Sequence, residues 1–140
     1  MKKFLFNANA TAFSLGLLIL RLGIGYSFVI NYGYGKISNP LKWKGLGEDM
    51  SLVHIHFAPE FWGFMAAFAE FFGAIFLAMG IFTRISCFLL AFTMFIAFLG
   101  GFTEHEFNSH AFEMMIVFVA IMFTGPGKYS LDARIGGFRK

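Results

Sequence analysis

Two side chains of opposite charge, Arg21 and Glu70, each stand inside a long apolar stretch of this sequence. A guanidinium group offers several fixed hydrogen-bond donors, and a carboxylate accepts hydrogen bonds or carries a proton. Side by side, the two groups could hold a small anion, a quinone head group or a proton. They could also form an ion pair that only fixes the register of two helices, and both interpretations stay open.

Further polar side chains precede or begin the last apolar stretch. His110 and Glu113 are three residues apart, so they would share one face of a helix. We predict that both lie at the mouth of a cavity formed by Arg21 and Glu70. The sequence identifies no catalytic residue.

Three other histidines, His54, His56 and His105, fall between apolar stretches. Imidazole suits zinc and copper, and His54 and His56 would point the same way in an extended segment. Their spacing matches no metal-binding motif, however, and histidines exposed in a wet loop are the simpler explanation. We predict no metal site and keep these residues as weak candidates. The single cysteine, Cys87, excludes an internal disulfide and a CxxC redox centre.

The composition indicates that the surrounding medium is lipid. Hydrophobic residues make up 58% of the 140-residue chain, charged residues only 14%, and the mean hydropathy is +0.70. A soluble domain has about 25% charged residues. Basic residues stand at the ends of the apolar stretches, which indicates membrane orientation rather than nucleic-acid binding.

Four apolar stretches predict one all-α membrane domain, residues 1–140, built as a four-helix bundle. The spans cover about residues 12–32, 61–82, 85–102 and 109–125, with a long outer loop over 33–59. Both termini are predicted to be cytoplasmic, because more basic residues fall on their side of the membrane. That side would carry Lys2, Lys3, Arg84, Lys128, Arg134, Arg139 and Lys140, and the other Lys36, Lys42 and Lys44.

Counting along these spans places the two intramembrane charges near the bilayer centre. Arg21 and Glu70 each lie nine residues into their spans, about 14 Å deep from opposite faces. A lone charge there costs at least about 2.5 kcal/mol, so pairing is favourable. Small residues flank Glu70 at helical spacing and would let another helix approach closely: Ala66, Ala67, Gly73 and Ala74. We therefore expect an Arg21–Glu70 pair.

Several motifs resemble those of the DoxX family of membrane proteins. Arg21-Leu22 and a glycine-lysine pair, Gly35-Lys36, look like the family's first span. Glu70, followed by Gly80-Ile81-Phe82-Thr83-Arg84, is similar to its second span and exit. Glu113 and the closing motif resemble its fourth span and end, and the closing motif is the most specific: Thr124-Gly125-Pro126-Gly127-Lys128-Tyr129-Ser130-Leu131-Asp132.

The resemblance implies a four-helix bundle in the bacterial inner membrane and a link to redox enzymes. Related proteins include DoxD, a subunit of a thiosulfate:quinone oxidoreductase. We therefore expect a subunit or partner of a quinone-linked oxidoreductase, with quinone as the possible ligand and no covalently bound cofactor. The alternatives are a small-solute carrier or channel, which would need a homo-oligomer, and a scaffold whose Arg21–Glu70 pair is structural.

Overall fold

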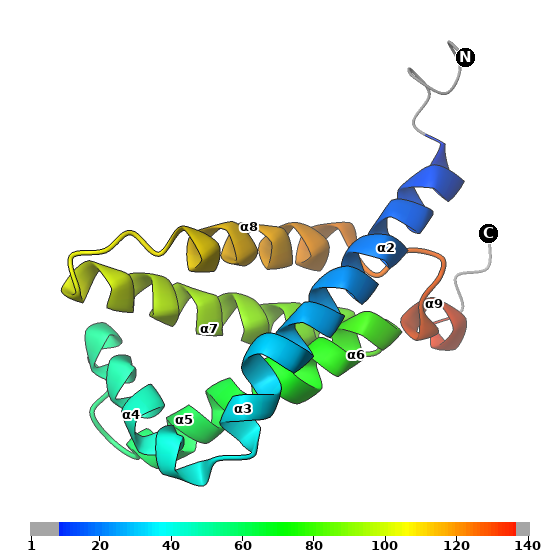
Figure 1. Cartoon of the computed structure of the whole chain (residues 1–140). Coiled ribbons are helices and arrows are strands. Elements are labelled where there is room, and N and C mark those ends of the chain that lie inside the picture. Colours follow the sequence, from blue (N-terminus) through cyan, green and yellow to red (C-terminus); the bar gives the residue numbers. More distant parts are fainter. Residues whose placement is uncertain (1–8, 137–140) are drawn as a thin grey trace.

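The structure is a computed structural model that describes residues 9–136, and all regular elements in that range are helical. Figure 1 shows α7 and α8 side by side and antiparallel, with α2 crossing them obliquely. The predicted all-α fold is confirmed. The core lies between these helices and α6 (Ala74–Met79), and it includes Phe28, Leu77, Leu90 and Phe118.

The first long helix is a single run from α2 (Ala10–Phe28) through a π-helical turn (Val29–Gly33) into α3 (Tyr34–Ile37). Asn9 caps its start by accepting a hydrogen bond from Thr11 N. The sequence predicted that this helix ends near residue 32. In the structure it continues about five residues further, to Ile37. Lys36 consequently belongs to this helix and not to the outer loop.

The second long helix has the same construction. It runs from α5 (Pro59–Phe68) through a π-helical turn (Ala69–Gly73) into α6 (Ala74–Met79), with Pro59 at its start where no N–H is needed. Gly80 ends it in the left-handed conformation, at φ +71°. The two π-helical turns contact each other, and a Cβ on Gly33 would lie 2.6 Å from the Glu70 carbonyl oxygen.

The remaining helices are α7 (Thr83–Thr103), α8 (Ser109–Thr124) and the short α9 (Leu131–Ile135). The predicted loop 33–59 instead contains short helices: η2 (Pro40–Lys42), α4 (Trp43–Glu48) and η3 (Asp49–Val53). Helix α4 packs directly against α5, as Figure 1 shows.

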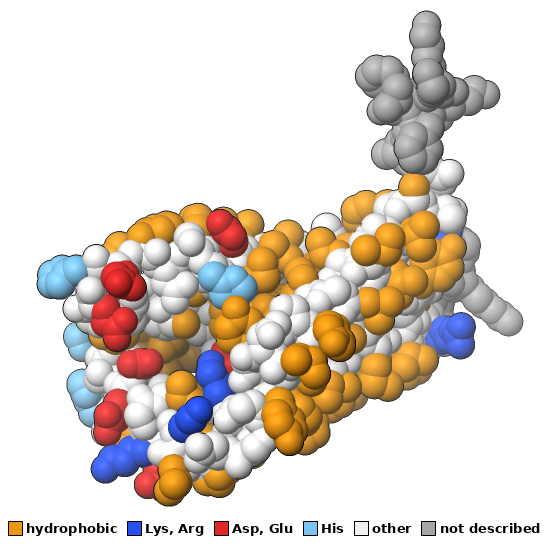
Figure 2. Space-filling view, viewed as in Figure 1, with side chains coloured by type: hydrophobic (Ala, Val, Ile, Leu, Met, Phe, Trp, Pro, Cys, Tyr) orange, Lys and Arg blue, Asp and Glu red, His pale blue; other side chains and the backbone are white. Residues whose placement is uncertain are grey.

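Three helical runs in the described part of the chain are long and apolar enough to cross a membrane: Ala10–Ile37, Pro59–Met79 and Thr83–Thr103. Helix α8 is apolar but has only 16 residues, about 24 Å. Large apolar side chains are exposed along the helices, as lipid contact requires (Figure 2). The cytoplasmic placement of the termini stays a prediction, and Lys2, Lys3, Arg139 and Lys140 lie outside the described residues.

The closing segment, residues 124–132, is tied to the turn between α6 and α7. Both oxygens of Asp132 accept backbone hydrogen bonds, at 2.9 Å from Phe82 N and 2.8 Å from Thr83 N. Asp132 N donates in turn to Gly80 O at 2.8 Å. The carboxylate thus satisfies two free N–H groups at the start of α7.

Asp132→Asn is expected to lower the free energy of unfolding by about 1 kcal/mol, because the amide keeps one acceptor oxygen and loses the other. Thermal unfolding of the detergent-solubilised protein measures the change. Glu60→Gln, at the exposed first turn of α5, is the control. Equal unfolding temperatures for the two variants would show that Asp132 does not cap α7.

Candidate functional site

Glu70 pairs with Lys36 and not with Arg21. Lys36 Nζ lies 2.6 Å from Glu70 Oε2, so the two groups form an ion pair. The Glu70 side chain is 1% exposed and that of Lys36 27%, so the ammonium group reaches toward solvent while the carboxylate is enclosed. Trp43 Nε1 donates to Lys36 O at 2.9 Å and fixes the end of the first helix.

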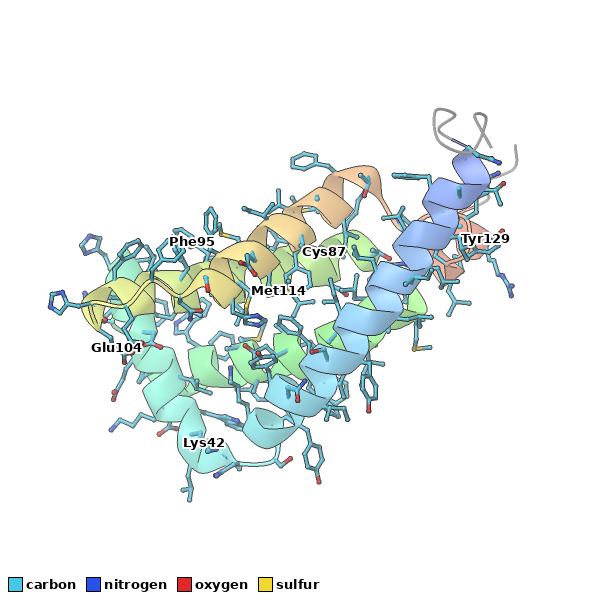
Figure 3. All side chains as sticks on the ribbon, turned by 45° about the horizontal axis from the view of Figure 1, so that its top comes forward. Lys42, Cys87, Phe95, Glu104, Met114 and Tyr129 are labelled. Carbon is cyan, nitrogen blue, oxygen red and sulfur yellow. The ribbon has the colours of Figure 1, made fainter. Side chains whose placement is uncertain are left out.

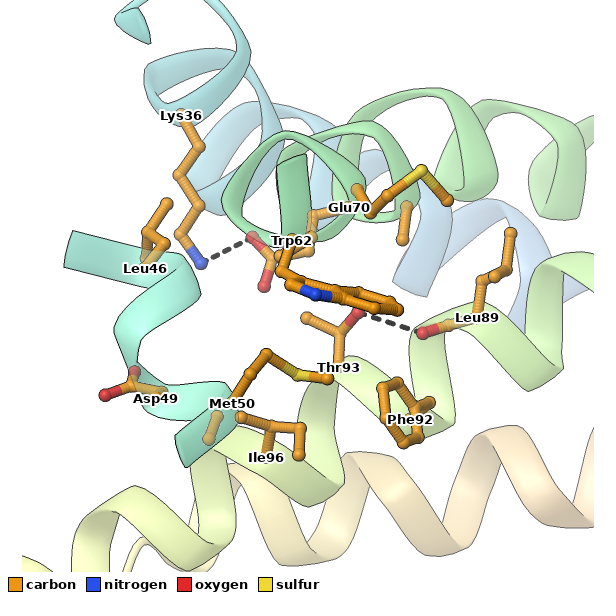
Figure 4. A pocket seen from close by; sticks show the side chains of 14 residues that line it. Lys36, Leu46, Asp49, Met50, Trp62, Glu70, Leu89, Phe92, Thr93 and Ile96 are labelled. Carbon is orange, nitrogen blue, oxygen red and sulfur yellow. Dashed lines mark hydrogen bonds and ion pairs between the residues drawn. The ribbon is translucent and has the colours of Figure 1, made fainter. Parts of the chain in front are cut away.

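The ion pair forms part of the wall of a cavity of about 120 Å³, here called the Glu70 cavity. Figure 4 shows the Trp62 indole beside Glu70, with Thr93 below it and Asp49 and Met50 on the side of α4 and η3. The walls are mostly apolar, and they include Leu46, Met65, Ala66, Ala69, Leu89, Phe92, Ile96 and Ala97.

Trp62 supplies an unused hydrogen-bond donor at this cavity. Its Nε1 is buried and has no hydrogen-bond partner among the described residues. The Thr93 hydroxyl, by contrast, donates to Leu89 O at 2.9 Å. A buried donor without an acceptor costs about 1–3 kcal/mol, so an acceptor bound in the cavity would relieve that penalty.

A second, more polar hollow of about 510 Å³ adjoins the Glu70 cavity, and Asp49 and Ala97 line both. We call it the acidic hollow because Asp49, Glu104 and Glu106 lie on its wall. Figure 2 shows Asp, Glu and His side chains gathered at this end of the molecule. The acidic hollow and the Glu70 cavity are therefore neighbours at this end of the helices.

Asp49 stands where the two spaces meet, and its surroundings disfavour its charge. Desolvation raises the pKa of this carboxyl most, Glu104 and Glu48 raise it further, and Lys36 opposes them. The folded protein therefore holds this proton more tightly than the unfolded chain does. The resulting stability is present below the ordinary pKa, about 3.8, and is lost as pH rises through the raised folded value.

Asp49→Asn is accordingly expected to raise the unfolding temperature at pH 7 slightly and to change it less at pH 4. The gain should not exceed about 0.5 kcal/mol, because Asp49 is exposed and solvent screens its charge. Thermal unfolding at both pH values measures it, with Glu60→Gln as the control for losing a carboxylate. A loss of stability at pH 7 would contradict the prediction.

Arg21 lies elsewhere, and the expected Arg21–Glu70 pair is wrong. Its side chain is 0% exposed and donates to two backbone carbonyls, at 3.4 Å to Leu77 O and 2.6 Å to Tyr129 O. The first helix places Gly33 against Glu70, and Arg21 is twelve residues, about 18 Å, before Gly33. Arg21 therefore joins α2, α6 and the closing segment, and takes no part in the Glu70 cavity.

Of His110 and Glu113, both on α8, only His110 lies at the acidic hollow. The His110 ring stacks on Tyr32 at a centroid distance of 5.2 Å and lines the acidic hollow. Glu113 is exposed on α8 and is not among the residues that line the Glu70 cavity or the acidic hollow. Of the four predicted residues, only Glu70 lines the cavity, and His110 lies at its approach.

No group of three or more His, Cys, Asp or Glu side chains in residues 9–136 is placed to hold a metal ion. His54, His56 and His105 are exposed, and two of them take the left-handed backbone conformation, His54 at φ 63° and His105 at φ 58°.

Sequence reasoning missed Lys36, Trp62 and Asp49. Gly33 and Gly35 looked like the end of the first span, so Lys36 was counted in the outer loop. The available signal was the absence of any proline before Pro40, which leaves a helix free to continue past those glycines. Trp62 was missed because it reads as an apolar residue near a helix start. Nothing in the sequence indicates that its N–H has no partner among the described residues.

Comparison with known families gives a match over most of the helical part of the chain. The family model described as DoxX matches residues 16–106, about two thirds of the chain. This range includes Arg21, Lys36 and Glu70, but it ends before Glu113 and the closing motif. No curated protein and no solved structure matches the chain.

Proposed function

The chain belongs to the DoxX family of membrane proteins, and from this premise we propose that it binds the ring of a quinone in the Glu70 cavity, as a subunit or partner of a membrane oxidoreductase. The observation that carries the proposal is the Trp62 Nε1, which has no hydrogen-bond partner within residues 9–136 and lies beside the Lys36–Glu70 pair in a mostly apolar cavity. A quinone combines the two properties that such a site selects, an apolar ring and carbonyl oxygens that only accept hydrogen bonds.

The size of the cavity limits a ligand to one ring at most. A cavity of about 150 Å³ binds benzene, and the Glu70 cavity measures about 120 Å³. An isoprenoid tail would have to leave the cavity toward lipid. Lys36 Nζ and Trp62 Nε1 would donate to the ring oxygens, in place of the Arg21 donor that the sequence suggested.

The charged pair also suits the proton chemistry of a quinone. Reduction to the quinol takes up two electrons and two protons. The electrons would come from a partner oxidoreductase subunit. Lys36 and Glu70 would exchange protons with the ring oxygens, and water would reach them by way of Asp49 and the acidic hollow.

Quinone retained by the purified protein tests the proposal. Protein extracted in mild detergent is denatured in organic solvent, and the released quinone is measured by mass spectrometry per mole of protein. Trp62→Phe keeps the ring and removes the N–H, so retention should fall about tenfold. Tyr26→Phe, which also removes one side-chain donor, is the control, because the exposed Tyr26 does not line the cavity. Absence of quinone from the wild type, or equal retention by both variants, would refute quinone binding.

A small-solute carrier is the second candidate, and the shared wall of the Glu70 cavity and the acidic hollow favours it. Asp49 and Ala97 border both spaces, as they would on a route from the outer helix ends toward the bundle interior. Flux of small anions or protons into proteoliposomes, reduced by Asp49→Asn, would support this function over the quinone site. Wild-type vesicles as tight as protein-free vesicles would exclude it.

A further inference from the structure

A third hollow, of about 680 Å³, lies at the opposite end of the bundle from α4, between the α6–α7 turn, the end of α8 and α9. Figure 3 shows Tyr129 at this end and Lys42 and Glu104 at the other. We call it the basic hollow, because Arg84 and Lys128 lie on its wall. Neither has an ion-pair partner within residues 9–136.

The basic hollow contains a buried polar group that the fold leaves unused. Thr83 is 0% exposed, and its Oγ1 has no hydrogen-bond partner among the described residues. Asp132, the acidic residue on this wall, is already engaged, since both its oxygens accept from Phe82 N and Thr83 N. Within the described part of the chain, the wall thus has two cations without an ion-pair partner and a buried hydroxyl without a hydrogen-bond partner, while its carboxylate binds the start of α7.

The surface beside these polar groups is apolar and exposed. Phe82 and Ile85 also line the basic hollow, and their side chains are 62% and 60% exposed. The hollow lies at the ends of the apolar helices, where lipid head groups meet the acyl chains. A ligand that matches both parts carries an anionic head on an apolar body.

We propose that the basic hollow binds an anionic phospholipid, with its phosphate between Arg84 and Lys128 and its acyl chains along Phe82 and Ile85. Basic sites between membrane helices bind acidic lipids by this combination of charge and apolar contact. Thr83 Oγ1 would donate to a phosphate oxygen, which satisfies the buried hydroxyl. This site is distant from the Glu70 cavity and does not depend on quinone binding.

Lipid-dependent thermal stability tests the proposal. Delipidated protein in mild detergent is titrated with phosphatidylglycerol, and the unfolding temperature gives the apparent affinity. The double variant Arg84→Gln/Lys128→Gln should bind about tenfold more weakly. Lys42→Gln/Lys44→Gln removes the same charge at the far end of the molecule and should bind as the wild type does.

Titration with two other ligands and a Thr83→Val variant identify what binds. Inorganic phosphate and phosphatidylcholine should each give a much smaller shift than phosphatidylglycerol. Thr83→Val removes the unused hydroxyl without changing side-chain shape, so it should fold normally and bind phosphatidylglycerol several-fold more weakly, counted as bound lipid by native mass spectrometry. An equal shift with phosphate or phosphatidylcholine, equal loss in the Lys42/Lys44 variant, or full lipid binding by Thr83→Val would overturn the proposal.

Discussion

Gly63→Ala is expected to separate α4 from α5 and to open the Glu70 cavity. A Cβ on Gly63 would lie 1.7 Å from the carbonyl oxygen of Trp43, and one on Gly47 would lie 1.6 Å from that of Pro59. Both obstacles are backbone atoms, so no side-chain rotation relieves them, and α4 as a whole must move. Helix α4 and the turn after it carry Leu46, Asp49 and Met50, which close one side of the cavity.

The expected loss of stability is at or above the upper end of the 1–3 kcal/mol that overpacking usually costs. Retained quinone should fall with it, because the cavity loses a wall. Gly45→Ala is the matched control in the same short helix, since nothing lies within 4 Å of its added methyl group. That change should stabilise the helix by about 0.5–1 kcal/mol.

Thermal unfolding and limited proteolysis of the 40–53 segment measure the two glycine variants. Gly63→Ala should unfold at a lower temperature and be cleaved faster, and Gly45→Ala should do neither. Similar behaviour of both would mean that α4 does not pack against α5 as described.

Lys36→Met is expected to lower the free energy of unfolding by about 3 kcal/mol. The substitution leaves the Glu70 carboxylate buried without its partner, and breaking a buried pair costs about 3–5 kcal/mol. The lower end applies because the Lys36 side chain is 27% exposed. The opposite change, Glu70→Gln, should cost less, since the lysine can turn toward solvent.

The double variant Lys36→Met/Glu70→Gln should recover most of the lost stability, and thermal unfolding of the set forms a double-mutant cycle. Lys42→Met, at an exposed lysine, is the control and should change stability by less than about 0.5 kcal/mol. A Lys36→Met variant as stable as Lys42→Met would show that the pair does not form.

The exchange Lys36→Glu/Glu70→Lys separates a structural pair from a ligand site. Restored stability together with restored quinone retention would indicate that the pair only fixes the two helices. Restored stability with lost quinone retention would indicate that the ammonium group and the carboxylate each make a specific contact with the ligand.

The sequence predicted the class of fold well, because long apolar stretches in lipid can satisfy their backbone only as helices. The bounds of the second long helix were also close to expectation, since Pro59 marks its start and Gly80 its end. The partner of Glu70 was not predictable from depth alone. The estimate of depth counted residues from an assumed end of each helix. Because the first helix runs on to Ile37, that assumption was wrong for it. The role of Arg21 depended on the carbonyl of Tyr129, 108 residues away in the chain.

The paired π-helical turns make this arrangement depend on where the chain length changes. A π-helical turn holds one residue more than the α-helical geometry around it requires. Deleting one residue from 29–33 would let that turn become ordinary α-helix, and the helix after it would keep nearly the same orientation. The same deletion within residues 22–28 would leave no surplus residue to remove and would rotate everything after it by about 100° relative to Arg21. A single-codon deletion would thus preserve the Lys36–Glu70 pair in the first case and misalign it with the Arg21 contacts in the second.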